Sequence, residues 1–174
     1  MKTNTISLAL VISFLLAACG ATPSWQTFTS DKGKFTVEMP ATPKESTQSV
    51  DTALGKIELT LYTAQVGTSA YLATFSDYPD VMSKADPAKV LDGAMNGAVT
   101  NVSGKILSSS DITINGNPGK EFSAEGKITN PGDGSVRGRI YLVKTRLYQL
   151  IVVGLKDQIP TADADRYLQS FKLN

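Results

Sequence analysis

The sequence has 174 residues, with 17 basic and 16 acidic side chains, no histidine and one cysteine. A nearly neutral chain is poorly suited to neutralise phosphates along a nucleic acid, so nucleic acid is excluded as a partner. A single cysteine cannot form an internal disulfide, so the fold must depend on its hydrophobic core.

The first 18 residues have the organisation of an export signal. Lys2 and a short polar stretch precede an apolar run at residues 6–18. This run is shorter than the roughly 20 residues that a membrane-spanning helix needs. The tetrapeptide LAAC at residues 16–19 resembles the bacterial lipobox, Leu-small-Ala-Cys, in which the cysteine is lipidated and the preceding peptide removed. The sequence therefore predicts a lipoprotein signal peptide over residues 1–18 and lipidation, typically with palmitate, at Cys19.

An ordinary secretory signal is the alternative, with Cys19 as an incidental thiol. Secreted proteins seldom keep a lone free cysteine, which favours the lipobox. Each buried methylene of a lipid contributes about 0.8 kcal/mol, and stable anchoring takes more than one acyl chain, as on a diacylated or triacylated cysteine. We therefore expect the membrane itself to be one partner, bound through the N-terminal lipid.

The predicted location is the extracytoplasmic side of the cell envelope. Gly20, rather than an aspartate, follows the cysteine, which leaves the outer membrane, its periplasmic face, or a thylakoid lumen in a photosynthetic host as addresses. Residues 19–24 form a short lipidated tether in this interpretation. Residues 25–174 then form a single domain.

The first half of this domain predicts strands and one helix. A hairpin is expected at residues 25–39, because apolar residues alternate on one side of a turn that contains Gly33. Further strands are expected around residues 57–61 and 70–78. Asp86 is a good N-cap before a helix of 3.6-residue period.

Two glycines interrupt this predicted helix. Gly93 and Gly97 lie four residues apart and each lowers helix stability by about 1 kcal/mol relative to alanine. We expect them to allow a close approach to the sheet, because the other faces of the helix are too polar for a membrane dimer.

The second half predicts four strands, at residues 106–114, 120–128, 136–143 and 146–155, with a loop at residues 129–135. Pairing Ile128 with Val136 would place Glu125 opposite Arg139.

The last hairpin and the last helix complete the predicted architecture. Tyr141 is expected to face Tyr148, and both faces of the last long strand are apolar. Thr161 is expected to cap a second helix, with Asp163 and Asp165 in its first turn. Its apolar stripe consists of Tyr167, Leu168 and Phe171. The prediction is an α+β fold, an antiparallel sheet of about seven strands with helices packed on both faces, or α/β/α sandwich.

Several stretches then resemble one known family. RIYLV at residues 139–143, RLYQL at 146–150, YLQSFK at 167–172 and GNPGKE at 116–121 are similar to the PsbP superfamily and its lipoprotein relatives of unknown function, as is the opening strand at residues 28–40. The resemblance implies the PsbP-like fold. In photosynthetic organisms it also implies attachment to the lumenal face of photosystem II, where PsbP proteins help retain inorganic cofactors.

Catalytic signatures do not occur in the sequence. General base catalysis near neutral pH usually recruits histidine, and there is no nucleophile elbow, phosphate loop or Cys/His pair. We therefore predict no catalytic residue, no cofactor and no metal site. A carboxylate pair stays formally open among Asp77, Asp80, Glu121 and Glu125. The stretch NPGDG at 130–134 lacks the ligand pattern of an EF-hand.

Two functions remain after these exclusions. The first is a non-catalytic accessory or interaction module that binds a protein partner, with Arg137, Arg139 and Arg146 as a candidate partner or anion patch. Pairing of these arginines with strand carboxylates such as Glu125 is the alternative reading. The second function is a small-molecule or ion binding module of the periplasm or lumen, with a cleft walled by tyrosines. The tyrosines available for such a cleft are Tyr62, Tyr71, Tyr78, Tyr141 and Tyr148.

Overall fold

The computed structural model describes residues 22–52, 55–129 and 132–174. The first half of the chain contains β1 (Gln26–Ser30), β2 (Phe35–Met39), β3 (Lys44–Thr52), β4 (Gly55–Val66), β5 (Ser69–Asp77), the 3-10 helix η1 (Asp80–Lys84) and α1 (Pro87–Thr100). The second half contains β6 (Lys105–Ile114), β7 (Asn117–Thr129), β8 (Gly132–Val143), β9 (Arg146–Leu155), α2 (Thr161–Gln169) and β10 (Lys172–Leu173).

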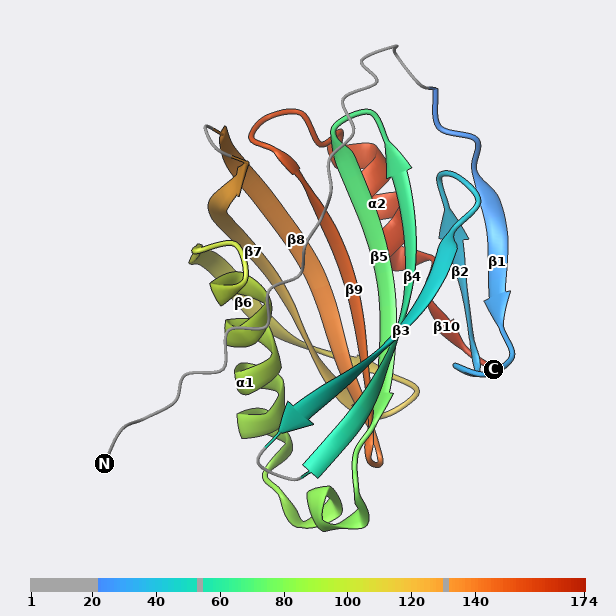
Figure 1. Ribbon diagram of the computed structural model, residues 1–174, viewed down its shortest axis with the longest axis vertical. Helices are drawn as coiled ribbons and strands as arrows, with labels where there is room; N and C mark the ends of the chain where they lie inside the picture. The colour runs from blue at the N-terminus through green and yellow to red at the C-terminus, as the bar shows by residue number, and fades with distance from the viewer. Residues whose placement is uncertain (1–21, 53–54, 130–131) are drawn as a thin grey trace.

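Seven strands form one sheet in the order β3-β4-β5-β9-β8-β7-β6 (Figure 1). All neighbours in it are antiparallel, which confirms the predicted α+β class and antiparallel sheet of about seven strands. A second sheet of three strands, β1-β2-β10, lies beside it. The hairpin predicted around Gly33 exists, with Phe28 paired to Val37, but it belongs to this second sheet.

The central strands of the large sheet are buried on both faces. Neighbouring residues of a strand point to opposite sides, and Tyr71 and Leu72 of β5 accordingly belong to different hydrophobic clusters. Helix α1 packs into the cluster of Leu72. The cluster of Tyr71 contains β2 as well as α2. The sequence predicts helices as the cover of both faces, whereas this second face is covered by the small sheet together with α2.

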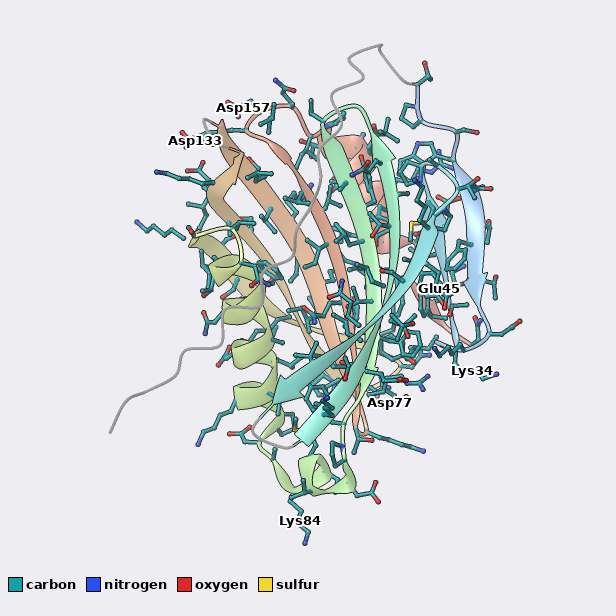
Figure 2. All side chains as sticks on the ribbon, viewed as in Figure 1. Lys34, Glu45, Asp77, Lys84, Asp133 and Asp157 are labelled. Carbon is teal, nitrogen blue, oxygen red and sulfur yellow. The ribbon has the colours of Figure 1, made fainter. Side chains whose placement is uncertain are left out.

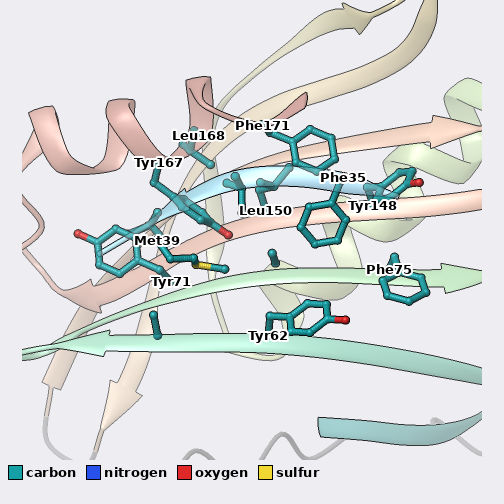
Figure 3. Packing of buried hydrophobic residues seen from close by; sticks show 14 of the residues in the cluster. Phe35, Met39, Tyr62, Tyr71, Phe75, Tyr148, Leu150, Tyr167, Leu168 and Phe171 are labelled. Atoms are coloured by element: carbon teal, nitrogen blue, oxygen red, sulfur yellow. The ribbon is translucent and has the colours of Figure 1, made fainter. Parts of the chain in front are cut away.

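Aromatic rings pack between the small sheet and the large one (Figure 3). Phe35 of β2 is fully buried, and its ring centre lies 6.0 Å from that of Tyr62, 6.1 Å from Tyr148 and 5.4 Å from Phe171. Such pairs contribute about 0.5–1.5 kcal/mol each beyond their buried area. One side chain of β2 thus contacts β4, β9 and the segment after α2.

The hairpin β7-β8 is paired four residues away from the predicted register. Arg139 lies opposite Glu121 rather than Glu125, and Val136 lies opposite Ala124. An even shift preserves which side of the sheet each residue faces. Each residue therefore faces the predicted side of the sheet, although the predicted residue pairs between β7 and β8 are wrong. In the next hairpin, the predicted pairing of Tyr141 with Tyr148 is confirmed, and it joins β8 to β9.

The sequence does not predict β3. Its residues, KESTQSVDT, show no apolar alternation, and β3 pairs only with β4 at one edge of the large sheet. An edge strand that makes few packing contacts with the core can be polar on both sides.

The predicted N-cap is confirmed for α1 but not for α2. Asp86 caps α1 as predicted, because its side chain accepts a hydrogen bond of 3.0 Å from the backbone N–H of Ala88. The predicted cap at Thr161 is wrong. Pro160 occupies the N-cap position of α2, without a side-chain cap, and Thr161 is the first helical residue.

The glycines of α1 do not approach the sheet. A Cβ atom placed on Gly93 or Gly97 would meet no other atom within 4 Å. The buried stripe of the helix is instead Leu91, Met95 and Val99. The predicted close approach is therefore wrong, and both glycines face solvent.

Candidate functional site

The predicted lipidation site lies outside the described part of the chain. Cys19 precedes residue 22, where the description begins, so signal peptide and lipid anchor stay predictions. Among the described residues, no helix is both long and apolar enough to cross a membrane.

Two of the three candidate arginines connect β8 to its surroundings. Arg137 Nη2 lies 2.6 Å from Asp165 Oδ1 of α2. Arg139 Nη2 lies 2.7 Å from Glu121 Oε2 of β7, and its Nη1 donates to the carbonyl of Leu168 at 3.3 Å. Both side chains are partly buried, so both guanidinium groups serve contacts between elements of the fold.

The third arginine, Arg146, clamps the β1-β2 turn. Its Nε and Nη2 each donate to a carboxylate oxygen of Asp77 at 2.6 Å, which raises the pKa of Arg146 further. Its Nη1 donates to the carbonyls of Lys32 and Gly33 at 3.3 and 3.2 Å. The guanidinium also lies 4.9 Å from the ring centre of Phe75. This side chain therefore joins β5, β9 and the small sheet.

The three arginines do not converge. Arg146, on β9, lies opposite Val143, at the C-terminal end of β8. Arg137 and Arg139 lie on β8 on the N-terminal side of Tyr141. Each has its own carboxylate. The geometry favours the pairing alternative, with Glu121 in the position expected for Glu125, and binding of a partner at these residues stays a prediction.

Four of the five tyrosines offered as walls of a cleft are core residues, and the fifth, Tyr78, is partly buried against the cluster of Leu72. Those that are 4% exposed or less are Tyr62, Tyr71, Tyr141 and Tyr148. Tyr148 donates from its hydroxyl to the carbonyl of Gly33 at 2.8 Å, and the hydroxyls of Tyr62 and Ser30 lie 2.9 Å apart. Burial raises the pKa of Tyr71 to about 12. These side chains hold the two sheets together rather than line a cleft.

Three of the four carboxylates that stay formally open as a catalytic pair are paired with basic side chains, and the fourth, Asp80, lies in the first turn of η1. Asp77 and Glu121 are bound by the arginines described above. Glu125 Oε1 lies 2.9 Å from Lys156 Nζ. Within residues 22–52, 55–129 and 132–174, no three acidic or cysteine side chains are grouped so as to hold a metal ion.

A groove that the sequence does not indicate lies on the outer face of the small sheet. It has a volume of about 430 Å³ and is open to solvent. Its walls come from β1, β2, β10 and the C-terminal end of α2. The lining residues are Thr27, Thr36, Val37, Glu38, Arg166, Gln169, Ser170 and Lys172.

Strand alternation presents polar side chains to this groove. Phe35, Val37 and Met39 of β2 have their side chains fully buried against the large sheet. Thr36 and Glu38 therefore point outward. Thr27 pairs with Glu38 across β1-β2, and Lys172 pairs with Thr36 across β10-β2.

Arg166 is held at the rim of the groove. Its Nε donates to Glu38 Oε2 at 2.7 Å and its Nη2 to Oε1 at 3.2 Å. The hydrogen bond with Arg166 lowers the pKa of Glu38, and the charge of Lys172 lowers it further. The guanidinium also lies 4.6 Å from the ring centre of Trp25. The arginine is thus fixed between an aromatic ring and a carboxylate.

Several donors of the groove are unused. Within the described part of the chain, the side chains of Thr27, Gln169 and Lys172 make no hydrogen bond or ion pair, and Arg166 uses only Nε and Nη2. Arg166 and Lys172 carry two positive charges against the one negative charge of Glu38. The groove therefore combines free donors with a net positive charge.

Two solved structures are similar to this chain. Cyanobacterial PsbP (CyanoP) from Synechocystis sp. PCC 6803 matches with a TM-score of 0.55 and 9% identity, over 94% of this chain and 99% of that one. A protein of unknown function from Pseudomonas aeruginosa, PA94, described as a putative regulator, matches with a TM-score of 0.44 and 9% identity, over 80% of this chain and 88% of that one. No family profile and no curated protein sequence matches the chain.

The likeness to CyanoP extends over nearly the whole of both chains, so this protein has a PsbP-like fold. At 9% identity the likeness concerns the fold alone. It confirms the fold that the motifs around residues 116–121 and 139–150 imply.

Proposed function

We propose that this protein is a lipid-anchored lipoprotein of the cell envelope that acts without catalysis as an accessory or interaction module. The observation that carries the proposal is a PsbP-like domain, similar to CyanoP over 94% of the chain, joined by a short tether to a lipobox cysteine. The resemblance to PsbP proteins, which attach to a larger membrane complex, supports a protein partner on the extracytoplasmic side. A photosystem is the partner expected in a photosynthetic host.

The side-chain arrangement supports this proposal over an enzyme. The three arginines and three of the four carboxylates that the sequence offers for chemistry are held in ion pairs, and each pair joins different parts of the fold. They hold together the PsbP-like domain, and a rigid domain on a lipid anchor is suited to hold a partner near a membrane.

The anchor is tested by metabolic labelling with radioactive palmitate. Wild-type protein should incorporate label and fractionate with membranes, whereas Cys19→Ala should do neither. Label on the Cys19→Ala variant, or unlabelled wild-type protein in the soluble fraction, would show that the lipobox reading is wrong.

The partner is tested by mild crosslinking and affinity purification from detergent extracts. A matched control carries residues 1–24 of an unrelated lipoprotein, so it keeps an anchor and changes only leader and tether. One stoichiometric partner should be recovered with both anchored forms. Recovery of the anchored protein alone would refute the interaction module.

The alternative is a small-molecule or ion binding module. The groove of Arg166 and Lys172 is the observation that favours it, because its donors are free and it is of the size of small-ligand sites, about 300–1,000 Å³. A thermal-shift screen of the full-length protein in detergent against metabolites and ions tests this function. No stabilising compound across a broad screen would exclude it.

A further inference from the structure

We propose that the groove on the outer face of the small sheet binds a phosphoryl group, with Lys172 and Arg166 as its cationic ligands. This inference rests on the alternative function, the binding module, and is independent of the lipid anchor. It names the ligand class and the residues that the screen leaves undefined.

Charge is the first argument for an anion. Glu38 is occupied by two hydrogen bonds from Arg166, and its low pKa keeps it ionised and paired near neutral pH. Lys172, in contrast, has no carboxylate within ion-pair distance among the described residues. Among the residues that line the groove, one positive charge is thus in excess, which attracts an anion rather than a cation. Asp163, outside the lining, acts on Arg166 and leaves Lys172 without a carboxylate of its own.

The distribution of donors is the argument for a phosphoryl group. Free donors come from three elements: Thr27 on β1, Arg166 Nη1 and Gln169 on α2, and Lys172 on β10. A phosphoryl group presents three oxygens in different directions, which suits donors that come from several sides of the groove. A carboxylate has only two oxygens, and its acceptor sites lie in one plane, so it matches donors spread over three elements less well.

The groove is also built rather than incidental. The Oγ atom of Ser170 accepts a hydrogen bond from the backbone N–H of Glu38 at 2.8 Å and donates to the carbonyl of Tyr167 at 2.8 Å. These bonds fix the end of α2 against β2. The two cationic side chains therefore start from backbone positions that do not need to move on binding.

Trp25 provides a signal for the test. It is the only tryptophan in the chain, and it stacks on Arg166, 4.6 Å from the guanidinium. An anion that recruits Arg166 Nη1 changes the charge next to the indole. Its fluorescence should therefore report occupancy of the groove.

The experiment is a titration of the full-length protein in a maltoside detergent with inorganic phosphate, at constant ionic strength. We expect a saturable change in Trp25 fluorescence, and calorimetry should give the same affinity. Loss of one charged hydrogen bond in Lys172→Gln should weaken phosphate binding about tenfold or more. Lys84→Gln is the matched control, because it removes the same charge from a lysine that is exposed and lies far from the groove (Figure 2).

A phosphate affinity of Lys172→Gln equal to that of Lys84→Gln would overturn the proposal, provided that both variants melt at the wild-type temperature. Acetate binding as tightly as phosphate would overturn it too. If phosphate fails while the thermal-shift screen finds another ligand, the phosphoryl group is wrong and the binding module stands.

A second arm distinguishes the source of the phosphoryl group. The Cys19→Ala chain is mixed with phosphatidylcholine vesicles, with or without phosphatidic acid, and sedimented. Lys172-dependent sedimentation with phosphatidic acid identifies a lipid headgroup. Binding of free phosphate without sedimentation identifies a soluble phosphorylated ligand. No response to either probe overturns the proposal.

Discussion

Tyr167 provides a test of how the aromatic cluster is stabilised. Its side chain is fully buried, and its hydroxyl has no hydrogen-bond partner among the described residues. Burial raises the pKa of this hydroxyl well above its ordinary value, so the group stays protonated. A buried donor without a partner costs about 1–3 kcal/mol. Tyr167→Phe removes that cost and leaves a gap of one oxygen, so we expect it to stabilise the fold by about 1 kcal/mol.

Tyr148→Phe is the matched change in the same cluster, and the opposite sign is expected. The hydroxyl of Tyr148 donates to the carbonyl of Gly33 at 2.8 Å. That carbonyl keeps its second donor, Arg146 Nη1 at 3.2 Å, so it is not left without a partner. The expected loss is therefore about 0.5–1.5 kcal/mol, the net contribution of one hydrogen bond.

Urea unfolding of both variants, in the Cys19→Ala background, measures the difference. The slope of the unfolding free energy against urea should be unchanged, because neither variant alters the surface exposed on unfolding. Melting temperatures should move in opposite directions, by about 2–4 °C per kcal/mol for a chain of this size. Equal destabilisation by the two variants would refute the reasoning, because it would mean that the hydroxyl of Tyr167 also has a partner.

Two further predictions concern glycines and acid. Gly93→Ala should raise the free energy of unfolding, measured in urea, by about 1 kcal/mol, since the position is helical and open. Gly138→Ala should lower it by about 1–3 kcal/mol, since a Cβ there would lie 2.6 Å from the ring of Phe122. Arg166 lowers the pKa of Glu38 in the fold, so this carboxyl stabilises the fold above its ordinary pKa and loses that contribution as the pH falls through its folded value. Glu38→Gln should therefore lose less stability than wild type between about pH 7 and about pH 3, and equal losses would contradict the role of the pair.

Which residues face each side of the large sheet could be predicted from the sequence, but the residue pairs across neighbouring strands could be predicted only in part. Alternation alone places Phe122 and Ala124 on the same face in any register that differs by an even number of residues. The charge of Arg139 does not distinguish the two registers, because Glu121 and Glu125 are both acidic and an even number of residues apart, so either could pair with it. The observed register instead places the ring of Phe122 over Gly138, which has no side chain to exclude it.

The small sheet shows a different limit of sequence reasoning. Its hairpin was predictable from Phe35, Val37 and Met39, and so was the presence of a buried face. The strand that completes it, β10, has only two residues, which is too short for a periodic signal. Without β10, no pattern places Lys172 next to Thr36. The groove therefore could not be predicted, although every residue in it is visible in the sequence.

Trp25 connects the groove to the predicted anchor. It stacks on Arg166 of the groove and follows Cys19 by only six residues, which can span at most about 20 Å when fully extended. If Cys19 carries lipid, Trp25 cannot lie farther than that from the bilayer surface, so the side of the groove at Arg166 is held near the headgroup phosphates. A soluble phosphorylated ligand gains nothing from this confinement, whereas a headgroup does. The position of the groove beside the first described residues thus favours the headgroup as the source of the phosphoryl group, and sedimentation with phosphatidic acid is the arm that decides it.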